Sequence, residues 1–176
     1  MPIQSINTSN ALAPSLRESV SETQGMYHRL VIVVETDSTQ KPGDLVEVAK
    51  QCTWPVINVN LELSSRLKDM SINSRPLNVD RCLRQIIGDH TSDIVVLIHN
   101  EILFDRALEQ NPMLMLRHLS RNKTIVAALN GHVAGGYLVF GPPEHPDHQR
   151  FEIDDEIVLN VNPINDHARM PAERPS

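Results

Sequence analysis

A polar segment at residues 35–42 holds the residues whose types and order come nearest to a known chemistry. It follows a continuous apolar run at 30–34 and precedes a predicted helix. Between a buried strand and a helix, backbone N–H groups and the helix N-terminus can bind a phosphate. The four residues at the end of the segment are therefore candidates for contact with a nucleotide such as ATP: Thr39, Gln40, Lys41 and Pro42.

The phosphate-binding pattern G-x-x-x-x-G-K-[S/T] is strongly degraded in this segment. Glu35 and Gln40 stand at the glycine positions, and Pro42 replaces the hydroxyl residue that would bind Mg²⁺, so only Lys41 matches. Side chains at the glycine positions obstruct the close approach of phosphate, and carboxylates repel it. Two interpretations stay open: a degenerate nucleotide loop, or an acidic surface loop that contains a lysine by chance.

A second group of candidates follows the apolar run at 94–98. This run is followed by a histidine and an asparagine rather than a carboxylate, and Glu101 is the first acidic residue after it. Glu101 and Asp105 are four residues apart and would share one face of a helix, where they could support acid–base or metal chemistry. The alternative is a solvated face that is ion-paired with Arg106.

Asn130 and Arg121 flank the next apolar run, at 124–129. Asn130 could orient an attacking water, or it could simply form a turn with Gly131. Arg117 and Arg121 precede the run, and either could reach the γ-phosphate of a neighbouring subunit or be solvated at the surface. Glu101, Asn130 and Arg121 are therefore the candidate catalytic residues, and ATP hydrolysis is not expected because the key loop positions are degraded.

Histidines and cysteines give weaker signals. The histidines of the C-terminal third are His132, His145, His148 and His167. His145 and His148 could form a bidentate metal pair, but no cysteine or carboxylate stands at a fixed spacing from them, so no metal site is predicted. Cys52 and Cys82 lie on the apolar faces of predicted helices and are interpreted as small core residues.

The elements that must position these residues alternate along the chain. The apolar runs at 30–34, 55–59, 94–98 and 124–129 predict buried strands, and 135–140 and 157–161 are further candidates, one of which could close the sheet. Helices are predicted from 44, over 63–70, over 78–88, near 103–108 and from 111–112 onward. Strands separated by helices pair in parallel, so we predict an α/β fold with a mainly parallel sheet sandwiched by helices.

The composition bounds the organisation and the partners. Residues 1–27 are predicted to be a disordered tail, 28–162 one domain, and 163–176 a flexible tail. There is no signal-like start and no apolar run long enough to span a membrane, so a cytoplasmic location is expected. The net charge of −6 disfavours DNA as a partner. DNA contact stays an alternative because of six basic positions: Arg75, Arg81, Arg84, Arg117, Arg121 and Lys123.

Several segments taken in order resemble a known family. They are 57–64 (INVNLELS), 103–105 (LFD), 119–124 (LSRNKT), 130–131 (NG) and 143–146 (PEHP). Together they resemble the small P-loop protein of type III BREX phage-defence systems, over residues 30–151. The family's phosphate-binding loop and the acidic end of its third strand are matched here only at Lys41.

The resemblance implies a P-loop NTPase-like fold of the additional-strand ATPase type, with strand order 5-1-4-3-2. It also implies an accessory subunit of a bacterial multi-protein defence system, whose other subunits would be its partners. The leading hypothesis is a subunit that acts by protein–protein interaction or homo-oligomer assembly and needs no cofactor. Weak binding of ATP and Mg²⁺, or a DNA-contacting regulatory role, are the alternatives.

Overall fold

A parallel sheet of six strands forms the centre of the protein. The computed structural model describes residues 3–6, 9–35 and 43–161. From one edge to the other the strands are β1 (Ile3–Ile6), β9 (Ile157–Val161), β2 (Leu30–Glu35), β5 (Thr124–Asn130), β4 (Ile94–Ile98) and β3 (Val56–Asn58). Every pairing between them is parallel. When β2, β3, β4, β5 and β9 are counted as strands one to five, their order is 5-1-4-3-2, as expected, and β1 adds an edge beyond β9.

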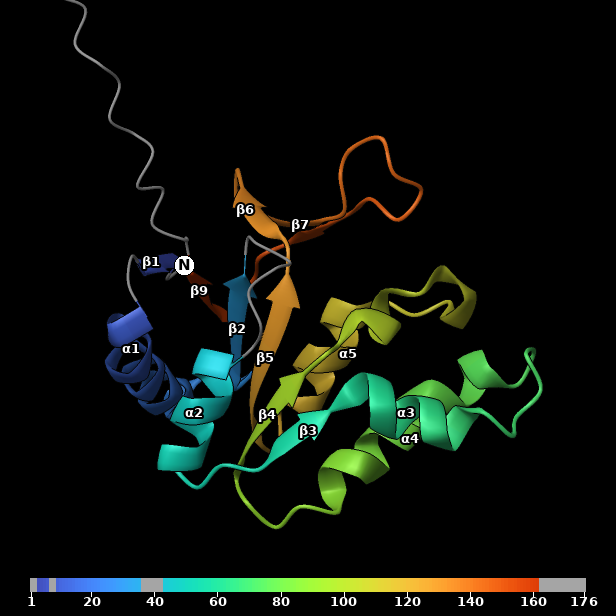
Figure 1. Cartoon of the computed structure of the whole chain (residues 1–176), viewed down its shortest axis with the longest axis horizontal. Coiled ribbons are helices and arrows are strands. Elements are labelled where there is room, and N and C mark those ends of the chain that lie inside the picture. Colours follow the sequence, from blue (N-terminus) through green and yellow to red (C-terminus); the bar gives the residue numbers. More distant parts are fainter. Residues whose placement is uncertain (1–2, 7–8, 36–42, 162–176) are drawn as a thin grey trace, which may run out of the picture.

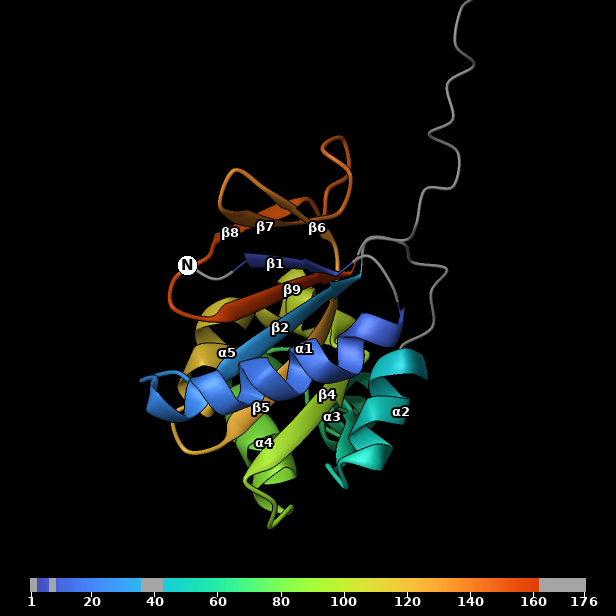
Figure 2. The ribbon, with the colours of Figure 1, turned by 90° about the vertical axis from the view of Figure 1, so that its left-hand side faces the viewer.

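Helices cover both faces of this sheet. The helices α1 (Ser9–Glu22) and α2 (Gly43–Gln51) lie on one face, and α3 (Val59–Leu67), α4 (Arg75–Gly88) and α5 (Pro112–Leu119) lie on the other (Figures 1 and 2). The apolar run of β2 explains the arrangement, because successive side chains of a strand point to opposite faces. Val31 and Val33 join the core under α1 and α2, while Leu30, Ile32 and Val34 join the opposite core.

The prediction of a disordered tail over residues 1–27 is wrong for the part that the structure describes. Leu12, Leu16 and Val20 lie four residues apart on α1 and are all buried against the sheet. Strand β1 pairs in parallel with β9, and η1 (Thr23–Gly25) leads into β2. The polar residues that suggested disorder lie mostly on the solvent side of a short amphipathic helix. The predicted C-terminal tail, 163–176, lies outside the described residues.

A small antiparallel sheet follows β5 and lies above the carboxyl edge of the main sheet. It consists of β6 (His132–Ala134), β7 (Tyr137–Phe140) and β8 (Gln149–Glu152). The candidate strand at 135–140 is therefore β7 in this second sheet, and the candidate at 157–161 is the one that closes the main sheet. Strand β8 was not predicted, because its side chains alternate between half-buried and exposed without a continuous apolar run. Phe140 of β7 packs against Phe104, with ring centroids 4.4 Å apart.

Several predicted boundaries shift in the structure. Helix α4 begins at Arg75 instead of Asn78, with Ser74 as its N-cap residue, so Asn78 lies within the first turn and its side chain donates to the Ser74 carbonyl. Residues near 103–108 form two 3-10 turns, η2 (Glu101–Phe104) and η3 (Arg106–Leu108). The predicted start of α5 is confirmed, with Pro112 as its first residue. Cys82 is buried as predicted, whereas Cys52 follows the end of α2 and is half-buried.

Candidate functional site

The carboxyl ends of the central strands bring together polar residues that are far apart in the sequence. In a parallel sheet all carboxyl ends share one edge, and ligands of α/β proteins bind there. Glu35 ends β2 and is the register partner of Asn130, which ends β5. The Gly131 N–H donates to the Glu35 carbonyl at 3.1 Å. Glu101 follows β4 at the same edge, so the fold assembles this group from three separate strands.

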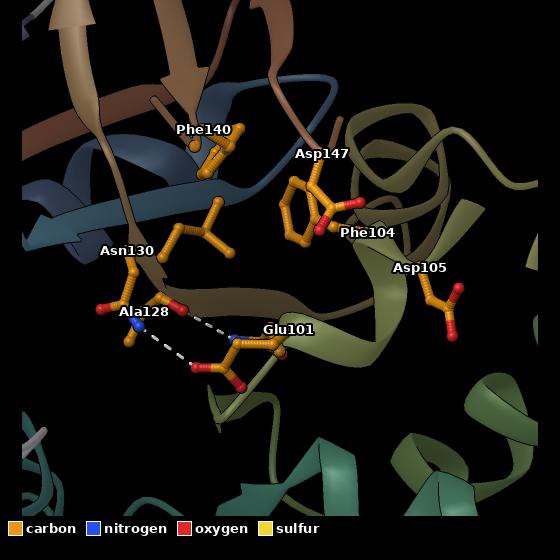
Figure 3. A pocket seen from close by; sticks show the side chains of 10 residues that line it. Glu101, Phe104, Asp105, Ala128, Asn130, Phe140 and Asp147 are labelled. Carbon is orange, nitrogen blue, oxygen red and sulfur yellow. Dashed lines mark hydrogen bonds between the residues drawn. The ribbon is translucent and has the colours of Figure 1, made fainter. Parts of the chain in front are cut away.

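Two asparagines hold the Glu101 carboxylate in place. Asn130 Nδ2 donates to Oε1 at 3.2 Å (Figure 3), and Asn60 Nδ2 donates to Oε2 at 2.8 Å. Asn60 Oδ1 in turn accepts from the Ile102 N–H at 2.8 Å, which fixes the start of η2. The structure therefore brings the predicted residues Glu101 and Asn130 into direct contact. Asn60 was not among the predicted site residues, although it follows a predicted strand directly, as Asn130 does.

Glu35 has an unusually high pKa for a carboxyl group. Burial and, to a smaller extent, the nearby carboxylates Asp44 and Glu101 together raise its pKa from 4.5 to about 7. Asp44 lies in the first turn of α2. Glu35 therefore exchanges its proton near neutral pH, and the local field at the end of β2 is negative. This negative field would repel a phosphate at the start of the degraded segment 35–42.

Asn100 is a buried amide at the end of β4 and was not among the predicted site residues. Its side chain is 2 % exposed. Its Nδ2 donates to the carbonyls of Leu97 at 3.0 Å and Ala128 at 2.8 Å, which joins the ends of β4 and β5. Its Oδ1 is buried and has no hydrogen-bond partner among the residues that the structure describes. Such an orphaned acceptor is uncommon in folded proteins, because a buried polar atom without a partner costs free energy.

A cavity of about 350 Å³ opens beside this group. Its walls come from the ends of β4 and β5, from η2, and from the loop after β7 (Figure 3). The polar side chains that line it are Asn100, Glu101, Asp105, Asn130 and Asp147, and the larger apolar ones are Phe104, Leu129 and Phe140. Among the residues that the structure describes, no lysine or arginine lines the cavity. Its chemistry is thus acidic and aromatic, which suits a hydrogen-bond donor or a cation.

The remaining predicted residues of this edge are arranged differently from the expectation. Glu101 and Asp105 do not share a helix face, because η2 is a single 3-10 turn and the backbone at Asp105 is extended. Asp105 Oδ1 accepts from the Ala107 N–H at 2.9 Å and caps the next turn. Arg106 forms no described ion pair with either carboxylate, and its Nη2 contacts the His148 carbonyl at 3.4 Å. The loop candidates Thr39, Gln40, Lys41 and Pro42 lie outside the described residues.

Arg121 and Arg117 lie at the opposite edge of the sheet. Both precede β5, a strand of seven residues, so about 20 Å of strand separates them from Asn130. The Arg121 guanidinium lies 5.0 Å from the centroid of the Tyr27 ring. Arg117 makes a bidentate pair with the fully buried Glu156, at 3.0 and 2.7 Å. Neither arginine can act on the Glu101 site of its own chain, and Arg117 is committed to an internal contact.

Most of the six basic positions considered for DNA contact are bound to nearby groups. Arg84 pairs with Asp80 at 2.6 Å on the surface of α4. Lys123 donates to the carbonyls of His90 and Ser92. Three arginines donate hydrogen bonds from their guanidinium groups: Arg75 to the Met70 carbonyl, Arg81 to Asn78, and Arg117 to Glu156. These contacts hold the side chains against the protein and give no specific support for DNA binding.

His145 and His148 make polar contacts within their own loop. His148 Nδ1 lies 3.1 Å from the Gly141 carbonyl oxygen, and His145 Nδ1 accepts from the Asp147 N–H at 3.2 Å. Within residues 3–6, 9–35 and 43–161 no group of three histidine, cysteine or acidic side chains is placed to hold a metal ion. His132 lies on β6, and His167 is outside the described residues.

Comparisons with protein-family models, with curated protein sequences and with solved structures find no match for this chain. Within the described part of the chain, no helix combines the length and the apolar character needed to cross a membrane. The fold and the site geometry are therefore the basis for any functional conclusion: an α/β protein with a parallel six-stranded sheet and an acidic, partly aromatic carboxyl edge.

Proposed function

We propose that the protein is a P-loop-like subunit that acts by binding other proteins, as an accessory component of a bacterial BREX-type defence system. The strand order 5-1-4-3-2 supports the P-loop-like part of the proposal. The degraded segment 35–42 follows β2, the strand after which a phosphate loop would stand. The resemblance of the ordered motifs supports the defence role.

The observation that carries the non-hydrolytic role is the negative field at the carboxyl edge. Glu35, Asp44 and Glu101 lie close enough for the last two to raise the pKa of the first. A nucleoside triphosphate carries several negative charges, and like charges in a partly buried site disfavour each other by several kcal/mol at most. The edge of the sheet that would receive the phosphates is therefore better suited to donors and cations on a partner.

The test compares assembly with and without nucleotide. Mass photometry of the purified protein should give the same distribution of masses with and without Mg-ATP, and the protein should co-purify with other subunits of its defence system. The double variant Glu35→Gln with Glu101→Gln removes two of the three carboxylate charges and should gain affinity for Mg-ATP over the wild-type chain. A wild-type monomer that assembles only when Mg-ATP is added would overturn the proposal.

A second candidate function is weak binding or slow hydrolysis of Mg-ATP, favoured by one specific observation. The Glu101 carboxylate lies beside Asn130 at the tip of the central strands, where a carboxylate and an amide could orient a water molecule. Mg²⁺ would then be held by the nucleotide itself. A thermal shift with Mg-ATP that disappears in Lys41→Ala but persists in the control Lys50→Ala, on α2, would support it.

A further inference from the structure

The cavity at the carboxyl edge is lined by groups that accept hydrogen bonds and bear negative charge. Glu101 and Asp147 reach it from two separate segments, the turn after β4 and the loop after β7 (Figure 3). Asp147 Oδ2 lies 3.4 Å from His145 Nδ1. That nitrogen also accepts a hydrogen bond from the Asp147 N–H at 3.2 Å. Among the described residues, no lysine or arginine forms an ion pair with either carboxylate.

The buried Asn100 adds an acceptor that the protein itself does not use. Its Nδ2 is committed to the Leu97 and Ala128 carbonyls, which fixes the orientation of the amide and leaves Oδ1 as the unused atom. Asn100 lines the cavity and is 2 % exposed. A buried acceptor without a partner costs free energy, and a donor on a ligand would remove that cost.

The apolar part of the cavity is aromatic. Phe104 and Phe140 line it, with their ring centroids 4.4 Å apart and their planes tilted by 44°. Aromatic faces attract cations, and planar delocalised cations stack on them. Phosphates and carboxylates would be repelled by Glu101 and Asp147. A metal ion would lack the required group of ligands among the described residues.

We propose that this cavity binds a guanidinium group. A guanidinium carries five N–H donors in one plane, pairs with carboxylates through two parallel hydrogen bonds, and stacks on aromatic rings. Glu101 and Asp147 supply the carboxylates, Asn100 Oδ1 accepts a further hydrogen bond, and Phe104 and Phe140 supply the apolar wall. The group can come from a small molecule or from an arginine side chain of a protein. The proposal does not depend on the defence role proposed above.

The experiment uses isothermal titration calorimetry on the full chain with two matched probes. Agmatine and 1,4-diaminobutane both carry two positive charges on a four-carbon chain, but only agmatine has a guanidinium. Agmatine should bind at least tenfold more tightly. Glu101→Gln and Asp147→Asn should each weaken agmatine binding by about tenfold, the usual effect of losing a charged hydrogen bond. Asp69→Asn, an exposed carboxylate outside the cavity lining, should leave binding within about twofold.

A third probe, N-acetylarginine amide, identifies the source of the group. Tighter binding of agmatine would assign the cavity to a free small molecule, and tighter binding of the arginine amide would assign it to a protein side chain. Both results support the proposal. Absence of binding for both guanidinium probes, equal affinity for agmatine and 1,4-diaminobutane, or unchanged affinity in both cavity variants would overturn it. These outcomes are independent of the assembly measurement, so failure of either proposal can be recognised separately.

Discussion

The amino edge of the parallel sheet, where the strands begin, and the carboxyl edge, where they end, differ in how their charged residues are paired. At the amino edge, Arg117 pairs with the buried Glu156, and His28 Nδ1 contacts Asp155 at 2.9 Å. The hydrogen bond to Glu156 raises the pKa of Arg117, so the guanidinium stays charged. At the carboxyl edge, Glu35 has carboxylates as its charged neighbours, and Asn100 Oδ1 has no described partner.

The difference between the two edges has opposite consequences for stability. A charged group that is paired and hydrogen-bonded inside the fold can be removed only at a cost in free energy of unfolding. A carboxylate forced among like charges lowers stability and is retained in proteins where a ligand or reaction uses it. The amino edge therefore fixes the strands in place, and the carboxyl edge is where the proposed partner or ligand would bind.

The largest effect is expected at the amino edge. Arg117→Leu leaves the Glu156 carboxylate buried and unpaired, because Glu156 is fully buried and accepts two hydrogen bonds from Arg117. We expect a loss of about 3–5 kcal/mol in the free energy of unfolding, measured by urea denaturation. The matched control is Arg84→Leu, which breaks an exposed pair within α4 and should cost about 0.5 kcal/mol or less. Equal losses in the two variants would contradict the assignment of the amino edge as structural.

The next effect is expected where the main sheet passes into the small one. A Cβ on Gly131 would lie 2.5 Å from the Val139 carbonyl oxygen, a backbone atom that cannot move aside easily. Gly131→Ala should therefore cost about 2 kcal/mol and loosen β6 and β7 over the cavity. Gly25→Ala is the control, since a Cβ there meets nothing within 4 Å. An unchanged unfolding midpoint for Gly131→Ala would show that the small sheet packs less closely than described.

Much of the main sheet could be predicted from the sequence, because its strands are continuous apolar runs that only a doubly covered sheet can bury. The runs at 30–34, 94–98 and 124–129 correspond to β2, β4 and β5, and their parallel order followed from the helices between them. The N-terminal helix was missed because three buried residues, Leu12, Leu16 and Val20, stand in an otherwise polar segment. Such a narrow apolar stripe can be recognised as one face of a helix only when the sheet that it packs against is known.

The site could be predicted only in part. Glu101 and Asn130 were identified because each follows an apolar run, and carboxyl ends of parallel strands meet at one edge. Asn100 was missed because its importance depends on which of its atoms finds a partner, which is a property of the folded packing. Asp147 and Phe140 come from a loop and a second sheet that no periodicity connects to β4.

A smaller effect, of opposite sign, is expected at the carboxyl edge. The folded-state pKa of Glu35 is raised from 4.5 to about 7. The folded protein therefore binds this proton more tightly than the unfolded chain, so the contribution to stability is present below pH 4.5 and is lost as the pH rises through about 7. At pH 8 the ionised carboxylate is a cost that Glu35→Gln removes. We expect this variant to be more stable than the wild type at pH 8 by roughly 1–2 kcal/mol, because partial solvation moderates the shift.

The control for Glu35 uses pH and a second glutamate. At pH 4 the wild-type side chain is already neutral in the folded state, so Glu35→Gln should be nearly without effect there. Glu47→Gln, at an exposed position of α2, should be nearly without effect at both pH values. Destabilisation by Glu35→Gln at pH 8 would mean that this edge is neutralised by an interaction with a cation, and the contrast between the two edges would fail.

The smallest effect concerns how the Glu101 carboxylate is held. Asn60→Ala removes two contacts at once, the Nδ2 donor to Glu101 and the Oδ1 acceptor for the Ile102 N–H. Because the site is half-exposed and water can replace both contacts, the loss in unfolding free energy should be only about 1 kcal/mol.

The more specific readout is amide hydrogen exchange. In Asn60→Ala the Ile102 N–H should exchange markedly faster, since it loses its acceptor. The Leu108 N–H, which donates to the Asp105 carbonyl, should be unaffected. Asn122→Ala, an exposed asparagine at the amino edge, should alter neither amide. If the Ile102 amide kept its protection in Asn60→Ala, the turn after β4 would be fixed by the backbone alone, and the carboxyl edge would be more rigid than its unsatisfied groups indicate.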